Sequence, residues 1–341
     1  MRSTHARTGS AMPAVLAAGI FLLLAGVGGV TTVLLMRGGG GPNSAEASGN
    51  ASASLSNDAI EAIGAAARDY LLDDDLGRAR AVLEAGVRQH PETHGLRTLL
   101  GSLEMQAGDY AAAYTQFEAA LAIGPRDPQT EFTAGTLAAR IGRDDRAIEH
   151  YSAAQRDDPG NPDYPLYLAQ VQMRRGELAP AAASLLRASR LDPDRAVVWG
   201  SLAEVELRQN RPGVAIEQAR KAQALEPRVV AWRVIEARAL KRQGEPQAAL
   251  EVLLALSETD RRSPEMLQLI AESYGMLGRV SDAATLYADA ADASPTSARL
   301  WREAAVWAER VGDAEQALRR AKHAAMLGDE AAAKMVERFQ G

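Results

Sequence analysis

Three acidic residues early in the chain have a spacing that proteins use to bind calcium. Asp73, Asp75 and Glu84 match the first, third and twelfth positions of an EF-hand loop. Arg78, however, occupies the sixth position, where that loop needs a glycine for its sharp turn. We therefore interpret these residues as a solvated turn whose carboxylates meet the positive end of a helix dipole.

The other candidates for metal binding or catalysis are weaker. His90 and His94 are four residues apart, but Pro91 lies between them, so they do not share a helical face. The chain has no cysteine, which excludes disulfides and thiolate metal sites. The glycines from Gly26 to Gly29 lie in an apolar run rather than in a phosphate loop, and no Ser/His/Asp set is suggested. The sequence predicts a protein without enzymatic activity, cofactor or metal.

An alanine recurs every 34 residues, and such a period is typical of a stacked repeat. A glycine or asparagine stands five residues before each alanine, except that Asp74 precedes the first. A proline stands twelve residues after each alanine, except at Arg261 and Asp329. The residue twelve before each alanine is always glycine or alanine. The eight periodic alanines are Ala79, Ala113, Ala147, Ala181, Ala215, Ala249, Ala283 and Ala317.

These positions suit a pair of antiparallel helices. The glycine or asparagine takes the left-handed conformation that closes the first helix. Pro212 and Pro246 fit the first turn of a second helix, where a missing N–H costs nothing. The later prolines end that second helix, and the small residues let the two helix axes approach closely. Because one pair cannot bury its apolar side alone, the pairs must stack into a solenoid.

On these residues the chain resembles the tetratricopeptide repeat proteins. The resemblance implies an all-α fold, namely a right-handed α-solenoid of about eight helix-turn-helix repeats. The second repeat shows the family pattern as Leu100-Gly101, Gly108, Ala113, Phe117, Ala120 and Pro125. The seventh shows it as Tyr274, Gly278, Ala283, Tyr287, Ala290 and Pro295.

The resemblance also implies that first-helix residues line a concave groove, which holds a peptide or helix of a partner. Arg140, Arg174, Arg208 and Arg242 share one position in four successive repeats, and Arg310 resumes it. We call these five residues the arginine row. They either grip an acidic peptide bidentately or simply meet the dipole of their own helix at its last turn. The other candidate groove residues are Phe132, Tyr167, Gln170 and Arg238.

A run of 24 residues without charge, Pro13 to Met36, predicts a membrane helix. At 1.5 Å per residue it is about 36 Å long, enough for a hydrocarbon core of roughly 30 Å. We favour an uncleaved anchor over a cleaved secretory signal, whose apolar stretch is usually about 7–15 residues. The predicted parts are a basic segment (1–12), a single transmembrane helix (13–36), a flexible linker (37–57), eight repeats (58–328) and a capping helix (329–341).

Charge around this run predicts the orientation. Arg2 and Arg7 precede it and only Arg37 closely follows it, which favours a cytoplasmic N-terminus and periplasmic repeats. The alanine and arginine richness, with only four lysines, indicates a bacterial protein of the inner membrane. The net charge of −6 gives no reason to expect nucleic acid as a partner.

The predicted function is therefore a membrane-tethered scaffold for protein partners in assembly or maturation of the cell envelope. Its contact with lipid would be through residues 13–36. The alternative is an accessory subunit of a membrane-associated enzyme complex on the cytoplasmic face. Homo-oligomerisation through the repeats is a third alternative.

Overall fold

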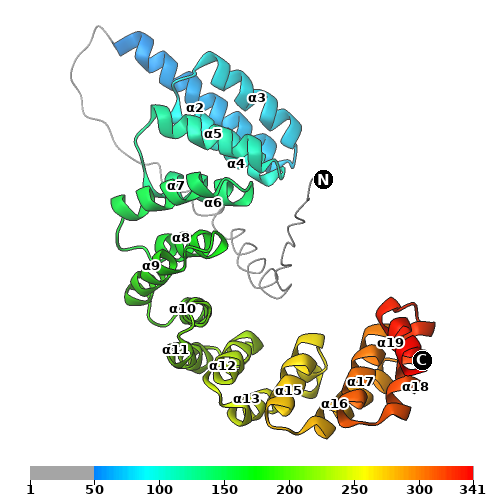
Figure 1. Cartoon of the computed structure of the whole chain (residues 1–341). Coiled ribbons are helices and arrows are strands. Elements are labelled where there is room, and N and C mark those ends of the chain that lie inside the picture. The colour runs from blue at the N-terminus through cyan, green and yellow to red at the C-terminus, as the bar shows by residue number, and fades with distance from the viewer. Residues whose placement is uncertain (1–49, 341) are drawn as a thin grey trace, which may run out of the picture. The chain divides into compact units, whose positions relative to one another are not determined.

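The computed structural model describes residues 50–340, which form eighteen helices and no strand (Figure 1). Among these residues no helix combines the length and the apolar character needed to cross a bilayer. The predicted membrane helix at 13–36 lies outside the described residues. The helices are α2 (Asn50–Leu72), α3 (Leu76–Gln89), α4 (His94–Gln106), α5 (Tyr110–Ile123), α6 (Pro128–Arg140), α7 (Asp144–Asp157), α8 (Asp163–Arg174), α9 (Leu178–Leu191), α10 (Ala196–Arg208), α11 (Pro212–Leu225), α12 (Val230–Gln243), α13 (Pro246–Leu254), α14 (Glu258–Arg261), α15 (Pro264–Met276), α16 (Val280–Ala293), α17 (Ala298–Val311), α18 (Ala314–Met326) and α19 (Glu330–Gln340).

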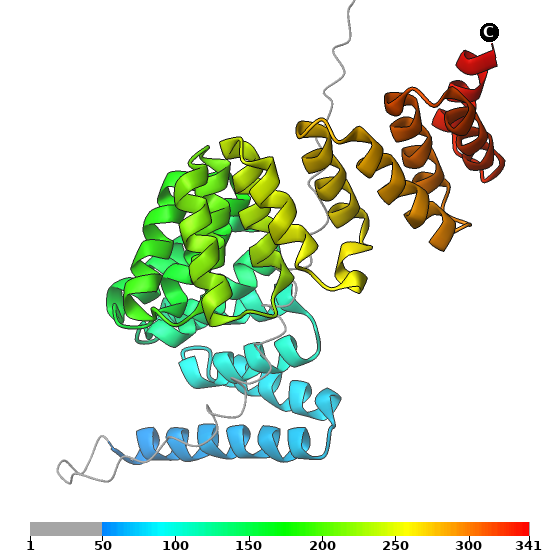
Figure 2. The same cartoon turned by 90° about the horizontal axis from the view of Figure 1, so that it is seen from below.

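The helices follow one another as packed pairs, and each pair packs on the next. Within a repeat α4 packs on α5, α6 on α7 and α10 on α11. The second helix of each pair then contacts the first helix of the following pair, as α5 does with α6 and α11 with α12. Both views show successive pairs side by side (Figures 1 and 2). The expected stack of helix pairs is therefore present, with its apolar core divided into clusters along the stack.

A left-handed residue closes the first helix of every repeat. Gly108, Gly142, Gly176, Gly244, Gly278 and Gly312 all have positive φ, as predicted. Asn210 (φ 61°) and Asp74 (φ 59°) take the same conformation, so the acidic exception to the glycine pattern performs the same turn. The residue after each turn donates to the carbonyl five positions back, as Asp109 N does to Glu104 O at 2.9 Å. This bond satisfies a carbonyl that the helix end would leave without a donor.

The periodic small residues lie where two helices approach most closely. Every one of the eight periodic alanines is fully buried, at 0 % exposure. At Gly101 a Cβ atom would lie 2.8 Å from the Phe117 ring, and at Gly135 it would lie 2.8 Å from the Tyr151 ring. Both aromatic rings come from the second helix of the same repeat. A larger residue at these glycines would therefore force the helices of the pair apart.

The sixth repeat departs from the others at the position where the proline is missing. Its second helix, α13, has only 9 residues, whereas α11 and α16 have 14. The short helix α14 follows, and its N-terminus is capped by the Ser257 hydroxyl, which accepts from Asp260 N at 3.1 Å. Ser263 then caps α15 by accepting from Met266 N. Ser257 therefore begins a new helix in the segment where α11 and α16 continue as one long second helix, and Ser263 begins the next first helix.

The two ends of the array differ in how far the sequence predicted them. Helix α2 begins at Asn50, inside the predicted linker at 37–57. No glycine or proline lies between Asn50 and Ile63, so nothing in this alanine-rich stretch stops the helix from extending. At the other end α19 begins after Asp329, whose Oδ1 accepts from Ala332 N at 2.9 Å.

The left-handed turns give a prediction for stability. We expect Gly278→Ala to destabilise the array by about 1–2 kcal/mol, because an L-residue is strained at φ 73°. No heavy atom lies within 4 Å of a Cβ at this site, so steric clash does not contribute. Gly213→Ala is the matched control, since its Cβ also meets nothing and its φ is ordinary for a helix. Urea unfolding should show a loss for the first variant and no loss for the second; equal losses would contradict this account.

Candidate partner-binding face

The predicted groove residues lie on consecutive first helices. Arg140, Arg174, Arg208 and Arg242 occupy the last turns of α6, α8, α10 and α12, and all four are exposed. Phe132 lies on α6, Tyr167 and Gln170 on α8, and Arg238 on α12, and these four are half-buried. We call the side of the array that carries these eight residues the first-helix face.

Three arginines of the row reach back to the preceding repeat. Arg208 Nη1 donates to Met173 O at 3.1 Å, and Arg242 Nη1 donates to Leu207 O at 2.7 Å. Arg174 Nη2 makes the equivalent, longer contact with Ala139 O at 3.5 Å. Each acceptor lies 35 residues before its arginine, in the last turn of the preceding first helix.

These contacts place a cation at the negative end of a neighbouring helix dipole. The helix-dipole interpretation of the row therefore extends from each arginine's own helix to the helix before it. The same carbonyls already accept from the left-handed turns, as Met173 O does from Gly176 N at 3.1 Å and Leu207 O from Asn210 N at 3.1 Å. The row thus also ties together the ends of successive first helices.

The remaining partners along the row are side chains. Arg140 stacks over the Tyr110 ring at 3.7 Å from its centroid, and Arg310 lies over Trp307 at 4.4 Å. Arg174 Nε also donates to Asp144 Oδ2 at 3.0 Å. A guanidinium held by one partner has a defined orientation, because its five N–H donors lie in one plane.

Aromatic rings form the part of this face that belongs to α6 and α8. Phe132 meets Tyr167 edge to face at 5.0 Å and also contacts Tyr164 at 5.4 Å. Tyr151 lies beneath them, with its hydroxyl 3.2 Å from Thr136 Oγ1. Since Tyr151 and Tyr164 are buried, the half-buried Phe132 and Tyr167 are the rings that remain partly open to a partner.

Charged residues form the part of the face that belongs to α10, α12 and α15. Arg238 pairs with Glu265, and Lys241 pairs with Glu272. Glu204 on α10 is half-buried, and this burial raises its pKa above the ordinary value, although Arg238, Arg208 and Arg242 each act to lower it. The first-helix face is therefore aromatic in the third and fourth repeats and ionic in the fifth to seventh.

The residues that suggested metal chemistry have local structural roles. Asp75 caps α3, because its Oδ1 accepts from Arg78 N at 2.9 Å. His90 follows the last residue of α3, and His94 begins α4. In the part of the chain that the structure describes, no three histidine or acidic side chains are grouped so that they could hold a metal ion.

An ionic cluster around the buried His150 and Glu131 joins the second and third repeats, and no pattern in the sequence predicted it. The His150 ring lies between two carboxylates, with Nδ1 2.7 Å from Glu131 Oε2 and Nε2 2.7 Å from Glu118 Oε1. Arg146 binds Glu118 through both carboxylate oxygens, at 2.9 and 2.7 Å. Burial alone would raise the pKa of Glu118, but the hydrogen bonds from Arg146 and the charge of His150 outweigh it and lower the pKa. Because the members come from α5, α6 and α7, no single sequence window contains them.

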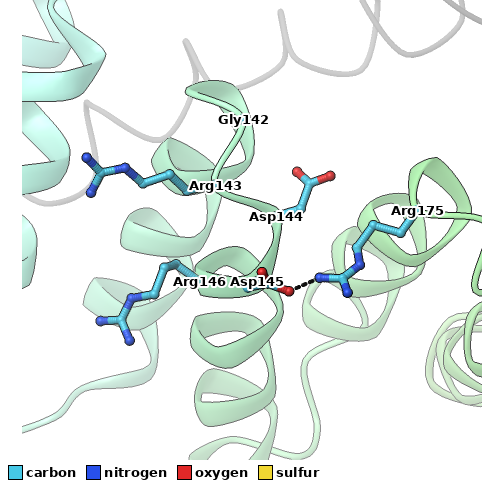
Figure 3. Close-up of a pocket in the computed structure, with 6 residues that line it drawn as sticks. All are labelled: Gly142, Arg143, Asp144, Asp145, Arg146 and Arg175. Carbon is cyan, nitrogen blue, oxygen red and sulfur yellow. Dashed lines mark hydrogen bonds and ion pairs between the residues drawn. The ribbon is translucent and has the colours of Figure 1, made fainter. Parts of the chain in front are cut away.

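A pocket of about 450 Å³ lies at the turn between α6 and α7. It is lined by Gly142, the four residues that follow it, and Arg175. Figure 3 shows Arg175 paired with Asp145, while the side chains of Arg143 and Arg146 point away from this ion pair. None of the predicted groove residues lines this pocket, and its carboxylates are paired: Asp144 with Arg174, and Asp145 with Arg175.

Comparison with known proteins establishes the family. Tetratricopeptide repeat models match residues 65–128, 104–164, 142–205, 201–265 and 235–298, which together span more than half of the chain. The chain therefore belongs to the tetratricopeptide repeat family. The comparison with curated proteins finds no match.

A solved tetratricopeptide repeat structure shares the fold at a TM-score above 0.5, and two others resemble the chain more distantly. A tetratricopeptide repeat protein from Parabacteroides merdae has a TM-score of 0.53 and 16% identity, over 73% of this chain and 99% of that one. YrrB, described as having an unusual peptide-binding site, has a TM-score of 0.46 and 17% identity over 49% of this chain and 86% of its own. The Naa15/Naa10 complex bound to HypK-THB gives a TM-score of 0.48 and 16% identity over 82% of this chain and 44% of that one.

The ionic cluster around His150 gives a prediction for the pH dependence of stability. We expect Glu118→Gln to lose about 1–3 kcal/mol of unfolding free energy at neutral pH, because it removes charged hydrogen bonds to Arg146. The folded-state pKa of Glu118 is lowered, so its contribution is present above the unfolded pKa and is lost as pH falls through the folded value. The difference between the variant and the parent protein should therefore shrink in acid.

Glu149→Gln is the control for this experiment, because Glu149 also pairs with Arg146 but its side chain is 58% exposed. Exposed ion pairs contribute little, so we expect a loss of about 0–1 kcal/mol. Urea unfolding across neutral and acidic pH measures both variants. A difference for Glu118→Gln that stayed constant with pH would show that the carboxylate charge is not what matters.

Proposed function

We propose that this protein is a scaffold whose first-helix face binds a peptide or helix segment of a partner protein. The observation that carries this proposal is the contact made by Arg174, Arg208 and Arg242 with the preceding repeat. Because each of these residues touches the first helix before its own, equivalent positions of α6, α8, α10 and α12 are neighbours. We infer that an extended segment of the partner lies along the side chains at those positions.

The chemistry of the row suits protein recognition. Aromatic residues and arginine are the types that contribute most to binding energy at protein interfaces. Phe132 and Tyr167 are in contact with each other and offer partly open rings. Gln170 lies one helical turn after Tyr167 and offers an amide for a backbone group of the partner. The family membership supports the same role.

We further propose that the array is tethered to the bacterial inner membrane by residues 13–36 and that the repeats lie in the periplasm. The support for this is the uncharged run of 24 residues and the larger number of arginines before it than directly after it. In that location the partners would be proteins of the cell envelope. On the opposite topology the scaffold would serve a cytoplasmic enzyme complex at the membrane.

The absence of cysteine makes the topology directly testable. In Asn57→Cys the single thiol lies at an exposed position of α2. Intact cells are treated with a thiol reagent that passes the outer but not the inner membrane. We expect labelling before lysis, because the predicted charge bias places this side of residues 13–36 outside the cytoplasm. Labelling that occurs only after lysis would reverse the proposed topology.

The binding face is tested by site-specific photo-crosslinking in cells. A photo-reactive amino acid at Gln170 of α8 should form an adduct with a partner, because this position lies beside the aromatic part of the face. The control position is Ala183, which is exposed on the second helix of the same repeat. Adducts of the same size and yield at both positions, or at Ala183 alone, would contradict binding by the first-helix face.

A further inference from the structure

Within residues 50–340, two neighbouring members of the arginine row have backbone partners rather than ion pairs. Arg208 and Arg242 each donate to a backbone carbonyl. Among residues 50–340, no carboxylate lies within ion-pairing distance of either guanidinium. Arg174, in contrast, pairs with Asp144. The row is therefore not uniform, and Arg208 and Arg242 are the adjacent members that combine a carbonyl contact with no ion pair among the described residues.

The carbonyl contacts prepare these two arginines for a ligand. A carbonyl is neutral, so it orients the guanidinium without cancelling its charge. Each contact uses Nη1, which leaves donors of the same planar group for a carboxylate. Because the arginines already hold their orientation, their side chains lose less conformational entropy when a partner binds.

Glu204 lies among these arginines without an ion pair of its own. It stands on α10 one helical turn before Arg208. Arg208, Arg238 and Arg242 are close enough to influence its charge, and Glu265 of α15 acts in the opposite direction. Among the described residues no cation lies within 4 Å of its carboxylate, and it makes no side-chain hydrogen bond. It therefore stands on the same helix as Arg208, within electrostatic reach of the guanidinium groups that an incoming acidic residue would use.

We propose that Arg208 and Arg242 form a seat for the carboxylates of an acidic segment of the partner, and that Glu204 sets the affinity by competing for the same arginines. This inference rests on the proposed function and specifies the partner's chemistry. Of the charged groups that act on Glu204, three are arginines (Arg208, Arg238 and Arg242), against the two carboxylates of Glu204 itself and Glu265. The positive excess attracts an acidic segment, and it grows when Glu204 becomes neutral.

The competition has a defined dependence on pH. Burial makes Glu204 take up a proton at higher pH than an ordinary glutamate of the partner does. As pH falls, Glu204 therefore becomes neutral while the partner's carboxylates are still charged. Binding of an acidic segment should tighten in that interval and weaken only when the partner's own carboxylates are protonated.

The experiment uses the full chain in a neutral detergent and a fluorescein-labelled octaglutamate peptide as the probe, measured by anisotropy at low ionic strength. Arg208→Gln and Arg242→Gln should each weaken binding by about fivefold or more. Arg190→Gln is the matched control, because Arg190 is exposed on the second helix α9, and it should change the affinity less than about twofold. Octalysine should not bind.

Glu204→Gln provides the decisive variant. It should tighten octaglutamate binding by about threefold or more at neutral pH and abolish the tightening on mild acidification. A variant that merely unfolded part of the array would weaken binding, so the expected change has the opposite sign to damage. Circular dichroism checks that the arginine variants remain folded.

Several results would overturn the proposal. If the control Arg190→Gln weakened binding as much as Arg208→Gln does, this would contradict a specific seat. An affinity of Glu204→Gln that is unchanged or weaker would contradict the competition. Failure of octaglutamate to bind at low salt, or equal binding of octalysine, would do the same. If Gln170 still formed its partner adduct in that case, the scaffold function would stand and only the acidic seat would be lost. If the Gln170 adduct were absent as well, both proposals would fail.

Discussion

The close approach of two helices at the periodic alanines is the constraint on which the array depends. Each alanine is fully buried, and in the second and third repeats a glycine of the first helix faces an aromatic ring of the second, as Gly101 faces Phe117. A side chain with more atoms at either place would separate the axes, and the pair would lose dispersion contacts along its length. Since each pair buries its apolar side only against its neighbours, local misfit would also weaken the adjacent repeats.

The turns and the arginine row solve a second problem, which is the unsatisfied end of each first helix. A left-handed residue turns the chain and brings a donor to the last carbonyls. In the fourth to sixth repeats an arginine from one repeat then donates to a carbonyl of the repeat before it. One set of side chains therefore contributes both to the stack and to the surface on which a partner would be recognised.

The departures from the period are as informative as the period itself. Asp74 breaks the glycine pattern yet takes the same left-handed conformation, because a short polar side chain tolerates it. Arg261 breaks the proline pattern, and there the helix does change: α13 is short and α14 follows. The turn depends on backbone conformation, which several residue types can adopt. In the sixth repeat, by contrast, the residues after α13 start a new helix, which Ser257 caps by accepting from Asp260 N.

The sequence by itself determined the helix pairs, their turns and the buried alanines, because each follows from residues within one period of 34 and repeats eight times. It also placed the arginines at one position of successive first helices. Only the tertiary structure decided which of them are balanced by acids: Arg174 meets Asp144, whereas Arg208 and Arg242 meet carbonyls. The burial of Glu204 and the cluster of Glu118, Glu131 and His150 were equally hidden. Charge balance depends on distances between side chains of different helices, and no spacing along the chain encodes those distances.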